Sequence, residues 1–198
     1  MQNPSAPPIV LASSSPYRRS LLARFLDSFE TVSPGIDESR QDGEAPEALA
    51  TRLARGKAEA VSRSQSGEAL VIGSDQLATI DDRVLGKPGT HAAAVDQLLG
   101  VSGQSVTFLT SVCLLDTGRR KRYEYSDRTI VRFRRFDRRL AEAYLRHDEP
   151  YDCAGSFRVE GAGFVLFESV QTEDPTALIG LPMIWLAGRL LELDYLRP

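Results

Sequence analysis

One stretch near the middle of the chain constrains the fold more than any other. Residues 69–88 read ALVIGSDQLATIDDRVLGKP, in which an apolar run, residues 69–72, is followed at once by Gly, Ser, Asp and Gln. An apolar run of this length before turn-forming residues predicts a buried strand, and ligands of α/β sheets gather beyond the ends of such strands. Asp75 is therefore a candidate reacting group.

A hairpin is expected directly after this strand. Residues 77–80 and 83–85 flank Asp81 and Asp82, a pattern typical of a two-residue hairpin turn. Such a hairpin would bring the carboxylate of Asp75 and the ammonium of Lys87 to one site. Taken singly, each residue also fits a plainer interpretation, Asp75 as a turn cap and Lys87 as a solvated loop lysine.

The composition indicates a globular protein with no broad affinity for nucleic acid. The chain has 198 residues, of which 42% are hydrophobic and 26% charged, and its net charge is −3. It contains no apolar run long enough to cross a membrane, and its first residues lack the charged and apolar parts of a signal peptide, so we expect a soluble protein that is not exported. Cys113 and Cys153 match no metal-binding spacing, so we expect free thiols in the cytoplasm. Residues 1–8 are expected to form a flexible tail, and residues 9–198 a single domain.

The first element of that domain is expected to bind an anion. Residues 9–12 predict a buried strand, which a serine-rich loop joins to a helix with Ser15 as its N-cap and Pro16 in its first turn. Free backbone amides at such a junction attract phosphate, and Arg18 would add a permanent positive charge. The alternative is an ordinary capped surface helix.

Two further charged residues stand out before the central stretch. The segment IDES contains Glu38, which together with Asp75 would offer hard oxygen ligands for a magnesium-like ion. In the helix expected over residues 46–64, Lys57 falls in the same four-residue series as Leu49, Leu53 and Val61. A lysine on this inward face either extends to water or has a buried anionic partner.

The second half of the chain predicts two long strands and a loop rich in glycine. The strands are expected over residues 105–116 and 123–136, with a helix after Asp137 as its N-cap. The segment EGAG, residues 160–163, permits close approach of its backbone to a ligand. Glu160 is the acidic residue of this loop, and its local sequence assigns it no role.

Taken together, these segments resemble a known family. The motifs LASSSPYRRSLL, IDES, RLARGKAEA, VIGSDQ, LGKP, AGSF and IGLPM follow one another in the order typical of the Maf-like nucleotide pyrophosphatases. The resemblance implies an α/β fold with an elongated, twisted, mixed β-sheet flanked by helices, similar to the inosine triphosphate pyrophosphatases. It also implies hydrolysis of a nucleoside triphosphate to a monophosphate and pyrophosphate, with a divalent metal, magnesium or manganese, in a cytoplasmic homodimer.

The resemblance assigns roles to residues of this chain. The family's proton acceptor falls on Asp75 and its second active-site acid on Glu38, and both are implied to hold the metal. Its basic residues, which would neutralise charge on the phosphates, fall on Arg18, Lys57 and Lys87.

The resemblance also implies a base preference. Members that act on dTTP and UTP have Arg, Thr and Gln where this chain has Tyr17, Gln76 and Glu160. The combination of Tyr17, Gln76 and Glu160 resembles the 7-methyl-GTP pyrophosphatase subfamily, which usually has Trp at the position of Tyr17. An aromatic ring attracts a cationic methylated guanine, and a carboxylate accepts from its N1 and N2 hydrogens. Other expected substrate-binding residues are Ser13 and Ser15.

Two alternatives remain open on the sequence. The chain could be a family member that acts on dTTP, UTP or another modified nucleotide. It could instead be a nucleotide-binding regulator of septum formation with little turnover. The presence of Asp75, Glu38 and Lys87 favours catalysis, because a pure binding protein has no need of a base.

Overall fold

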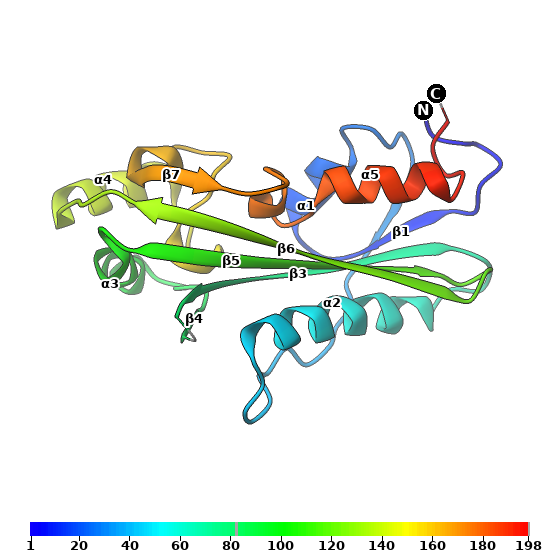
Figure 1. Ribbon diagram of the computed structural model, residues 1–198, viewed down its shortest axis with the longest axis horizontal. Helices are drawn as coiled ribbons and strands as arrows, with labels where there is room; N and C mark the ends of the chain where they lie inside the picture. Colours follow the sequence, from blue (N-terminus) through cyan, green and yellow to red (C-terminus); the bar gives the residue numbers. More distant parts are fainter. Residues whose placement is uncertain (82, 198) are drawn as a thin grey trace.

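A seven-stranded mixed β-sheet extends along the long axis of the molecule (Figure 1). The computed structural model describes residues 1–81 and 83–197. The strand order of the sheet is β2-β1-β3-β5-β6-β7, and β4 pairs with β3. Strand β1 is parallel to both of its neighbours, whereas every other pairing is antiparallel. The strands are β1 (Ile9–Ala12), β2 (Glu30–Val32), β3 (Leu70–Ile80), β4 (Arg83–Leu85), β5 (Ser105–Asp116), β6 (Lys121–Phe133) and β7 (Phe167–Gln171).

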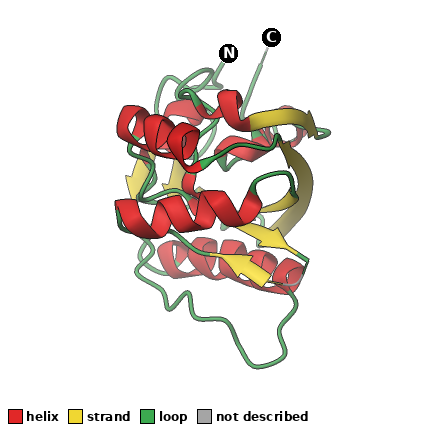
Figure 2. Ribbon diagram, turned by 90° about the vertical axis from the view of Figure 1, so that its left-hand side faces the viewer, coloured by secondary structure: helices red, strands yellow, loops and turns green. Residues whose placement is uncertain are grey.

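Helices cover both faces of this sheet. Helix α2 packs along one face, α1 and α5 lie on the other face at one end, and α3 and α4 lie near β7 at the opposite end (Figures 1 and 2). The expected elongated, mixed α/β fold is thereby confirmed. The helices are α1 (Pro16–Leu22), α2 (Pro46–Ser62), α3 (His91–Val101), α4 (Arg138–Asp148) and α5 (Met183–Glu192), with short 3₁₀ turns η1 (Ala154–Ser156), η2 (Gly163–Leu166) and η3 (Ala177–Ile179).

A polar band crosses the sheet between hydrophobic cores at its two ends, and a third core packs α2 against β1 and β3. At one end, a core packs α3 and α4 against the start of β5 and the end of β6. At the other end, a core packs α1 and α5 against β1 and the first residues of β3. Between them, Asp75 lies opposite Ser111, and Gln76 lies opposite Thr110, which pairs in turn with Asp127. Because buried polar side chains need partners, Gln76 and Thr110 of this band donate hydrogen bonds to the carbonyl oxygen of Ala177 in the neighbouring turn η3.

The central strand is longer than the sequence predicts. Strand β3 continues through Gly73, Ser74 and Asp75 instead of ending at residue 72, so the expectation that Asp75 follows a strand end is wrong. Gly73 therefore does not form a turn. A Cβ atom at Gly73 would lie 2.2 Å from the carbonyl oxygen of Ala54 and 2.6 Å from the nitrogen of Ala58, so the glycine lets α2 approach the sheet closely.

The hairpin after this strand is confirmed in its pairing. Strand β4 returns antiparallel to β3, with Ile80 opposite Arg83 and Ala78 opposite Leu85. Of the two predicted turn residues, Asp81 has a positive φ of 50°, and Asp82 lies outside the described residues.

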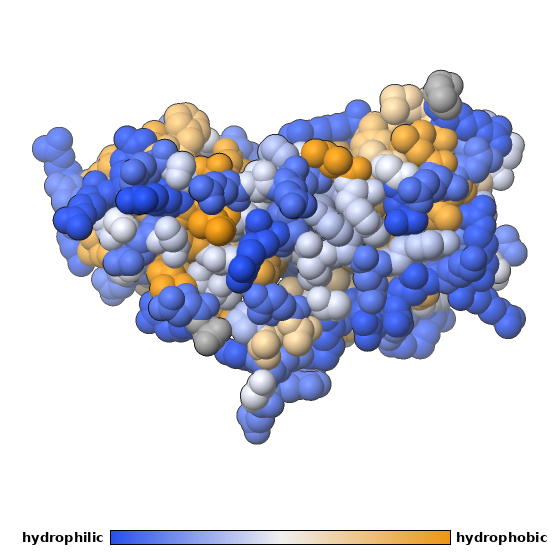
Figure 3. Space-filling view, viewed as in Figure 1, coloured by the Kyte–Doolittle hydropathy of each residue, from blue (hydrophilic) through white to orange (hydrophobic). Residues whose placement is uncertain are grey.

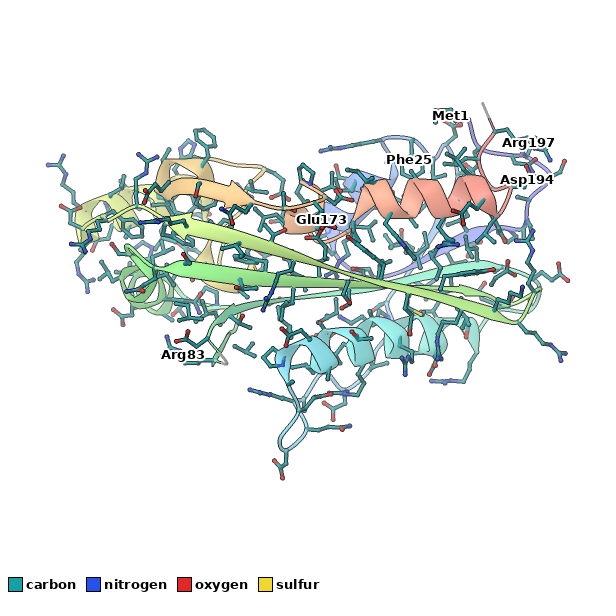
Figure 4. The ribbon with its side chains drawn as sticks, viewed as in Figure 1. Met1, Phe25, Arg83, Glu173, Asp194 and Arg197 are labelled. Atoms are coloured by element: carbon teal, nitrogen blue, oxygen red, sulfur yellow. The ribbon has the colours of Figure 1, made fainter. Side chains whose placement is uncertain are left out.

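The N-terminal segment differs from the expected loose tail. The backbone N–H of Asn3 donates to the carbonyl oxygen of Tyr195 at 2.9 Å, and Gln2 forms a β-bridge with Leu196. Figure 4 shows Met1, Asp194 and Arg197 at the same end of the molecule. Sequence reasoning missed this contact because the partner residues are almost the whole chain apart.

The surface drawn in Figure 3 is mainly hydrophilic, and the hydrophobic side chains on this face form separate groups near the two ends of the sheet. A search of the described helices for a long apolar stretch finds none that would span a bilayer.

The close contact at Gly73 predicts a large effect of one methyl group. We expect Gly73→Ala to lower the free energy of unfolding by about 3 kcal/mol, because the new methyl group meets rigid backbone of α2. Gly67→Ala is the control, since a Cβ there meets nothing within 4 Å. Chemical denaturation of both variants checks this, and equal midpoints for Gly73→Ala and the wild type would contradict it.

Candidate active site

A gap beside the central strand creates the candidate site. Strand β1 ends its pairing opposite Gly73, and β4 ends its pairing opposite Ala78, so the stretch of β3 between these two residues has one open edge. Side chains alternate across a strand, which places Asp75 on the face covered by α2 and Gln76 on the opposite face. At the open edge, both side chains reach the same cavity.

This cavity has a volume of about 580 Å³, a size typical of small-ligand sites. Every site residue that the sequence indicated lines it. Those residues are Ser13, Ser15, Tyr17, Arg18, Glu38, Lys57, Asp75, Gln76, Lys87 and Glu160.

The ammonium group of Lys57 joins the two candidate acids. Its Nζ atom lies 2.6 Å from Oδ1 of Asp75 and 2.8 Å from Oε1 of Glu38. Lys57 and Asp75 are buried, whereas Glu38 remains about half exposed with a side-chain exposure of 54%. Of the two expectations for this lysine, the structure therefore confirms the buried anionic partner.

The carboxylate of Asp75 combines an ion pair with an unused oxygen. Burial raises the pKa of Asp75 above its ordinary value, and the positive charges of Lys57 and Arg18 oppose that shift. Its Oδ2 atom is buried and has no hydrogen-bond partner in the described part of the chain. A carboxylate in this state keeps lone pairs available for a proton or a cation.

Arg18 is held at the cavity by contacts with remote backbone. Its Nε atom donates to the carbonyl oxygen of Gly180 at 2.8 Å, and its Nη1 atom donates to Oγ of Ser13 at 3.4 Å. The residue is partly exposed, but its guanidinium is enclosed, and this burial lowers its pKa while Asp75 and Glu38 oppose the shift. Ser15 caps the helix by accepting from the N–H of Arg18, as the sequence predicts.

The short first helix weakens one expectation about anion binding. Helix α1 spans only Pro16–Leu22, so few peptide dipoles add up at its N-terminus. Positive charge at the cavity is therefore supplied chiefly by the side chains of Arg18, Lys57 and Lys87. Lys87 is exposed and makes no ion pair with any described residue.

Tyr17 and Glu160 come from segments far apart in the sequence. The hydroxyl of Tyr17 lies 3.8 Å from Sγ of Cys153, and burial raises the pKa of that hydroxyl. Glu160 is an exposed residue, and partial desolvation of its carboxylate raises its pKa while the nearby Arg158 opposes the shift. Arg158 also lines the cavity, but its local sequence carried no signal that would have identified it.

The turn η3 forms a wall of the site that the sequence did not indicate. The side-chain amide of Gln76 donates to the carbonyl oxygens of Ala177 and Leu178 at 2.8 and 3.1 Å. The hydroxyl of Ser74 lies 2.9 Å from the carbonyl oxygen of Gly180 and 2.8 Å from that of Ser111, and its one hydrogen is shared between these two acceptors. These contacts occupy the Gln76 amide nitrogen and leave its oxygen for other partners.

The glycine-dense loop also differs from its expected use. A Cβ atom at Gly161 would lie 2.3 Å from the carboxylate oxygen Oδ2 of Asp148, so this glycine admits a side chain of the protein itself. The residues of the loop that face the cavity are Arg158, Val159 and Glu160.

The carboxylates of the site suit a metal ion only when a bound molecule supplies further oxygen ligands. No group of three or more His, Cys, Asp or Glu side chains suitable for a metal occurs among the described residues. Glu38 and Asp75 are two carboxylates that share one cation, Lys57, and one of their oxygens is buried without a partner. A magnesium-like ion needs no more than one or two carboxylates when phosphates supply the rest of its coordination, so these residues fit such an ion.

Comparisons with known proteins find matches over almost the full length of the chain. The family model described as "Maf-like protein" matches residues 8–193. A 7-methyl-GTP pyrophosphatase of Cupriavidus metallidurans is 50% identical over 98% of both chains. One of Pseudomonas aeruginosa is 48% identical over 94% of this chain and 96% of its own. A solved HAM1 protein from Coxiella burnetii matches in fold, with a TM-score of 0.53 and 16% identity, over 94% of this chain and 100% of its own.

The buried ion pair predicts a pH-dependent loss of stability. We expect Lys57→Met to lower the free energy of unfolding by about 3 kcal/mol at neutral pH, because it leaves the Asp75 carboxylate buried without its main cation. The folded-state pKa of Asp75 would then rise further above its unfolded value of 3.8. A raised pKa favours the folded state at low pH and loses this contribution as the pH rises, so the deficit should shrink toward pH 4.

Denaturation of this variant at several pH values is the measurement. Lys121→Met, at an exposed lysine, is the control and should stay near the wild type. A deficit that is absent, or that grows toward acid pH, would show that Lys57 does not hold the Asp75 charge.

Proposed function

The chain belongs to the Maf-like protein family, and we propose that it hydrolyses 7-methyl-GTP to 7-methyl-GMP and pyrophosphate. The observation that carries this proposal is the near-half identity, over almost the full length, to relatives named 7-methyl-GTP pyrophosphatase. The family resemblance of the sequence motifs is confirmed by the same matches. The cavity described above supports the proposal by bringing a base, three cations and an aromatic ring together.

In the proposed reaction, Asp75 accepts the proton of the attacking water. Its raised pKa makes it a better base than an ordinary carboxylate, while Lys57 keeps it ionised despite its burial. Two hydrogens of the Lys57 ammonium serve Asp75 and Glu38, and the third remains for a phosphate oxygen.

The other cations stabilise the charge that grows as the bond between the phosphates breaks. We assign this role to Arg18 and Lys87, because electrostatic stabilisation is the main catalytic task in phosphate chemistry. The contact of Arg18 with the Gly180 carbonyl fixes its direction before the substrate arrives, and this lowers the entropic cost of the transition state. Ser13 and Ser15 would complete the phosphate side of the cavity.

Glu38 and Asp75 would hold a divalent metal, magnesium or manganese, between themselves and the phosphates. When bound, such an ion neutralises phosphate charge and lowers the pKa of a coordinated water. The unpartnered Oδ2 atom of Asp75 and the half-exposed Glu38 carboxylate are the oxygens available for it.

Base recognition is assigned to a different set of residues, namely Tyr17, Glu160 and Gln76. Tyr17 would stack on the methylated guanine, whose positive charge favours an aromatic face. Glu160 would accept from the N1 and N2 hydrogens of the base, a donor pair that pyrimidines lack. Gln76 would act mainly by fixing the turn η3, because its amide nitrogen donates to the carbonyl oxygens of Ala177 and Leu178.

The homodimer, the single domain over residues 9–198 and the cytoplasmic location remain part of this proposal. They rest on the family resemblance and on the kind of substrate proposed.

Pyrophosphate release by the purified chain with magnesium tests the proposed function. The substrates are 7-methyl-GTP, GTP, dTTP, UTP, CTP and ATP, and we expect a strong preference for 7-methyl-GTP. A preference for dTTP or UTP would keep the catalytic residues but overturn the assignment of the base. No turnover of any nucleotide would favour the alternative of a binding regulator.

Asp75→Asn separates catalysis from binding. We expect kcat to fall about a hundredfold or more, because the amide cannot accept the proton, while nucleotide affinity measured by calorimetry stays within a few-fold. Asp96→Asn, at an exposed acid on α3, is the control. Unchanged turnover in Asp75→Asn would mean that another group is the base.

Glu160→Gln tests the reading of the base. The amide places a donor where the carboxylate had only acceptors, so we expect the preference for 7-methyl-GTP over UTP to fall about tenfold with kcat little changed. Glu168→Gln, which alters an exposed ion pair on β7, is the matched control. Unchanged selectivity would remove Glu160 from base recognition.

A further inference from the structure

We propose that Asp148, the last residue of α4, is a positioning residue that fixes the loop of residues 158–162 and so holds the Glu160 carboxylate at the cavity. The inference rests on the proposed function, because it explains how the base-reading side of that same site is kept in place.

The contacts of Asp148 converge on one end of this loop. The backbone N–H of Ala162 donates to its Oδ2 atom at 2.8 Å. Gly161 lies so close that a Cβ atom would be 2.3 Å from the same oxygen. The Nε atom of Arg158 lies 3.9 Å from it. Because a carboxylate accepts an amide hydrogen strongly, this contact restrains the position of the loop relative to α4.

A second residue of the same helix fixes the other end of the loop. The hydroxyl of Tyr144 accepts from the backbone N–H of Arg158 at 3.0 Å. The loop is therefore tied to α4 at Arg158 and at Ala162, and Glu160 lies halfway between the two attachments. Arg158, Val159 and Glu160 face the cavity, whereas Gly161 contacts the carboxylate of α4.

The helix provides a rigid base for these attachments. Ala141, Tyr144 and Leu145 are buried in the hydrophobic core that also contains residues of α3, β5 and β6. A group bonded to this face of α4 is thus fixed relative to the sheet that carries the rest of the site.

An aspartate at position 148 is unfavourable for the end of α4 but favourable for binding the loop. A helix C-terminus carries partial negative charge, which disfavours a carboxylate there, and burial adds a desolvation cost. Asp148 is only 5% exposed. Its bond to Ala162 and the nearby Arg158 offset both costs, so the acid is explained by what it holds and not by the helix that carries it.

A loosened loop should affect recognition of the base and spare the chemistry on the phosphates. Glu160 is two residues from the anchored amide, whereas Asp75, Lys57 and Arg18 are held by contacts on other elements. We therefore expect Asp148→Ala to raise KM for 7-methyl-GTP about tenfold, within the range that a displacement of about 1 Å of a positioning group causes. kcat, and kcat/KM for UTP, should change by less than about twofold.

The experiment combines kinetics with amide hydrogen exchange of the full chain. In Asp148→Ala, exchange of the Ala162 amide should accelerate together with the rise in KM. Asp148→Asn should restore most of both properties, because its side-chain oxygen still accepts from Ala162. Glu142→Ala, which removes ion pairs with Arg138 and Arg146 from the same helix, is the control and should match the wild type.

A variant of the loop gives an independent test if Asp148→Ala does not fold. Gly161→Ala leaves Asp148 in place but pushes the loop away from it, so it should produce the same faster exchange and the same rise in KM. Unchanged exchange at Ala162 would overturn the proposed contact. Faster exchange with unchanged KM would overturn the role in positioning.

Failure of the proposed function has a different signature. If the wild type shows no preference for 7-methyl-GTP over UTP, the assigned substrate is wrong. The exchange rate of Ala162 in Asp148→Ala then still decides whether Asp148 fixes the loop.

Discussion

The ion pair between Lys57 and Asp75 is the interaction on which the rest of the site depends. A buried lysine and a buried aspartate stabilise each other only if their elements are held within hydrogen-bond distance, because each charge alone would be costly in this position. Helix α2 reaches that distance because Gly73 leaves room for its backbone against β3. In the proposed function, the same contact keeps a base ionised at an open strand edge that lines the cavity.

The hydrophobic cores at the two ends of the sheet leave the cavity two distinct sides. In the proposed function, residues on α1, on α2 and after β4 would bring positive charge to the phosphates, whereas the segment before β7 would bring Glu160 and Arg158 to the base. Between them the sheet is polar, and the η3 turn is held by side-chain hydrogen bonds from Ser74 and Gln76. Such bonds depend strongly on direction, so they fix the wall of a site more closely than apolar contacts would.

In the proposed function, this arrangement separates chemistry from specificity within one fold. The likeness to the HAM1 protein concerns the fold alone, and folds host many activities. The distinguishing features of this chain are side chains at the open edge of β3 and on a loop tied to α4. Replacement of that loop alone would change the reading of the base without moving Asp75, because the two are held by different elements.

Much of the local structure was determined by the sequence itself. The Ser15 cap, the hairpin between β3 and β4, the strands β5 and β6 and the inward direction of Lys57 follow from short-range patterns of polarity and turn residues. The ordered motifs also identified the family and the residues that line the cavity. Only the tertiary structure decided that Gly73 serves helix packing, that Asp75 lies within a strand, and that Gly180 and Asp148 hold Arg18 and the loop of Glu160. The physical reason is that a local pattern reports the preference of a residue for water or for a backbone conformation, whereas these contacts join distant segments whose approach depends on the packing of the whole sheet.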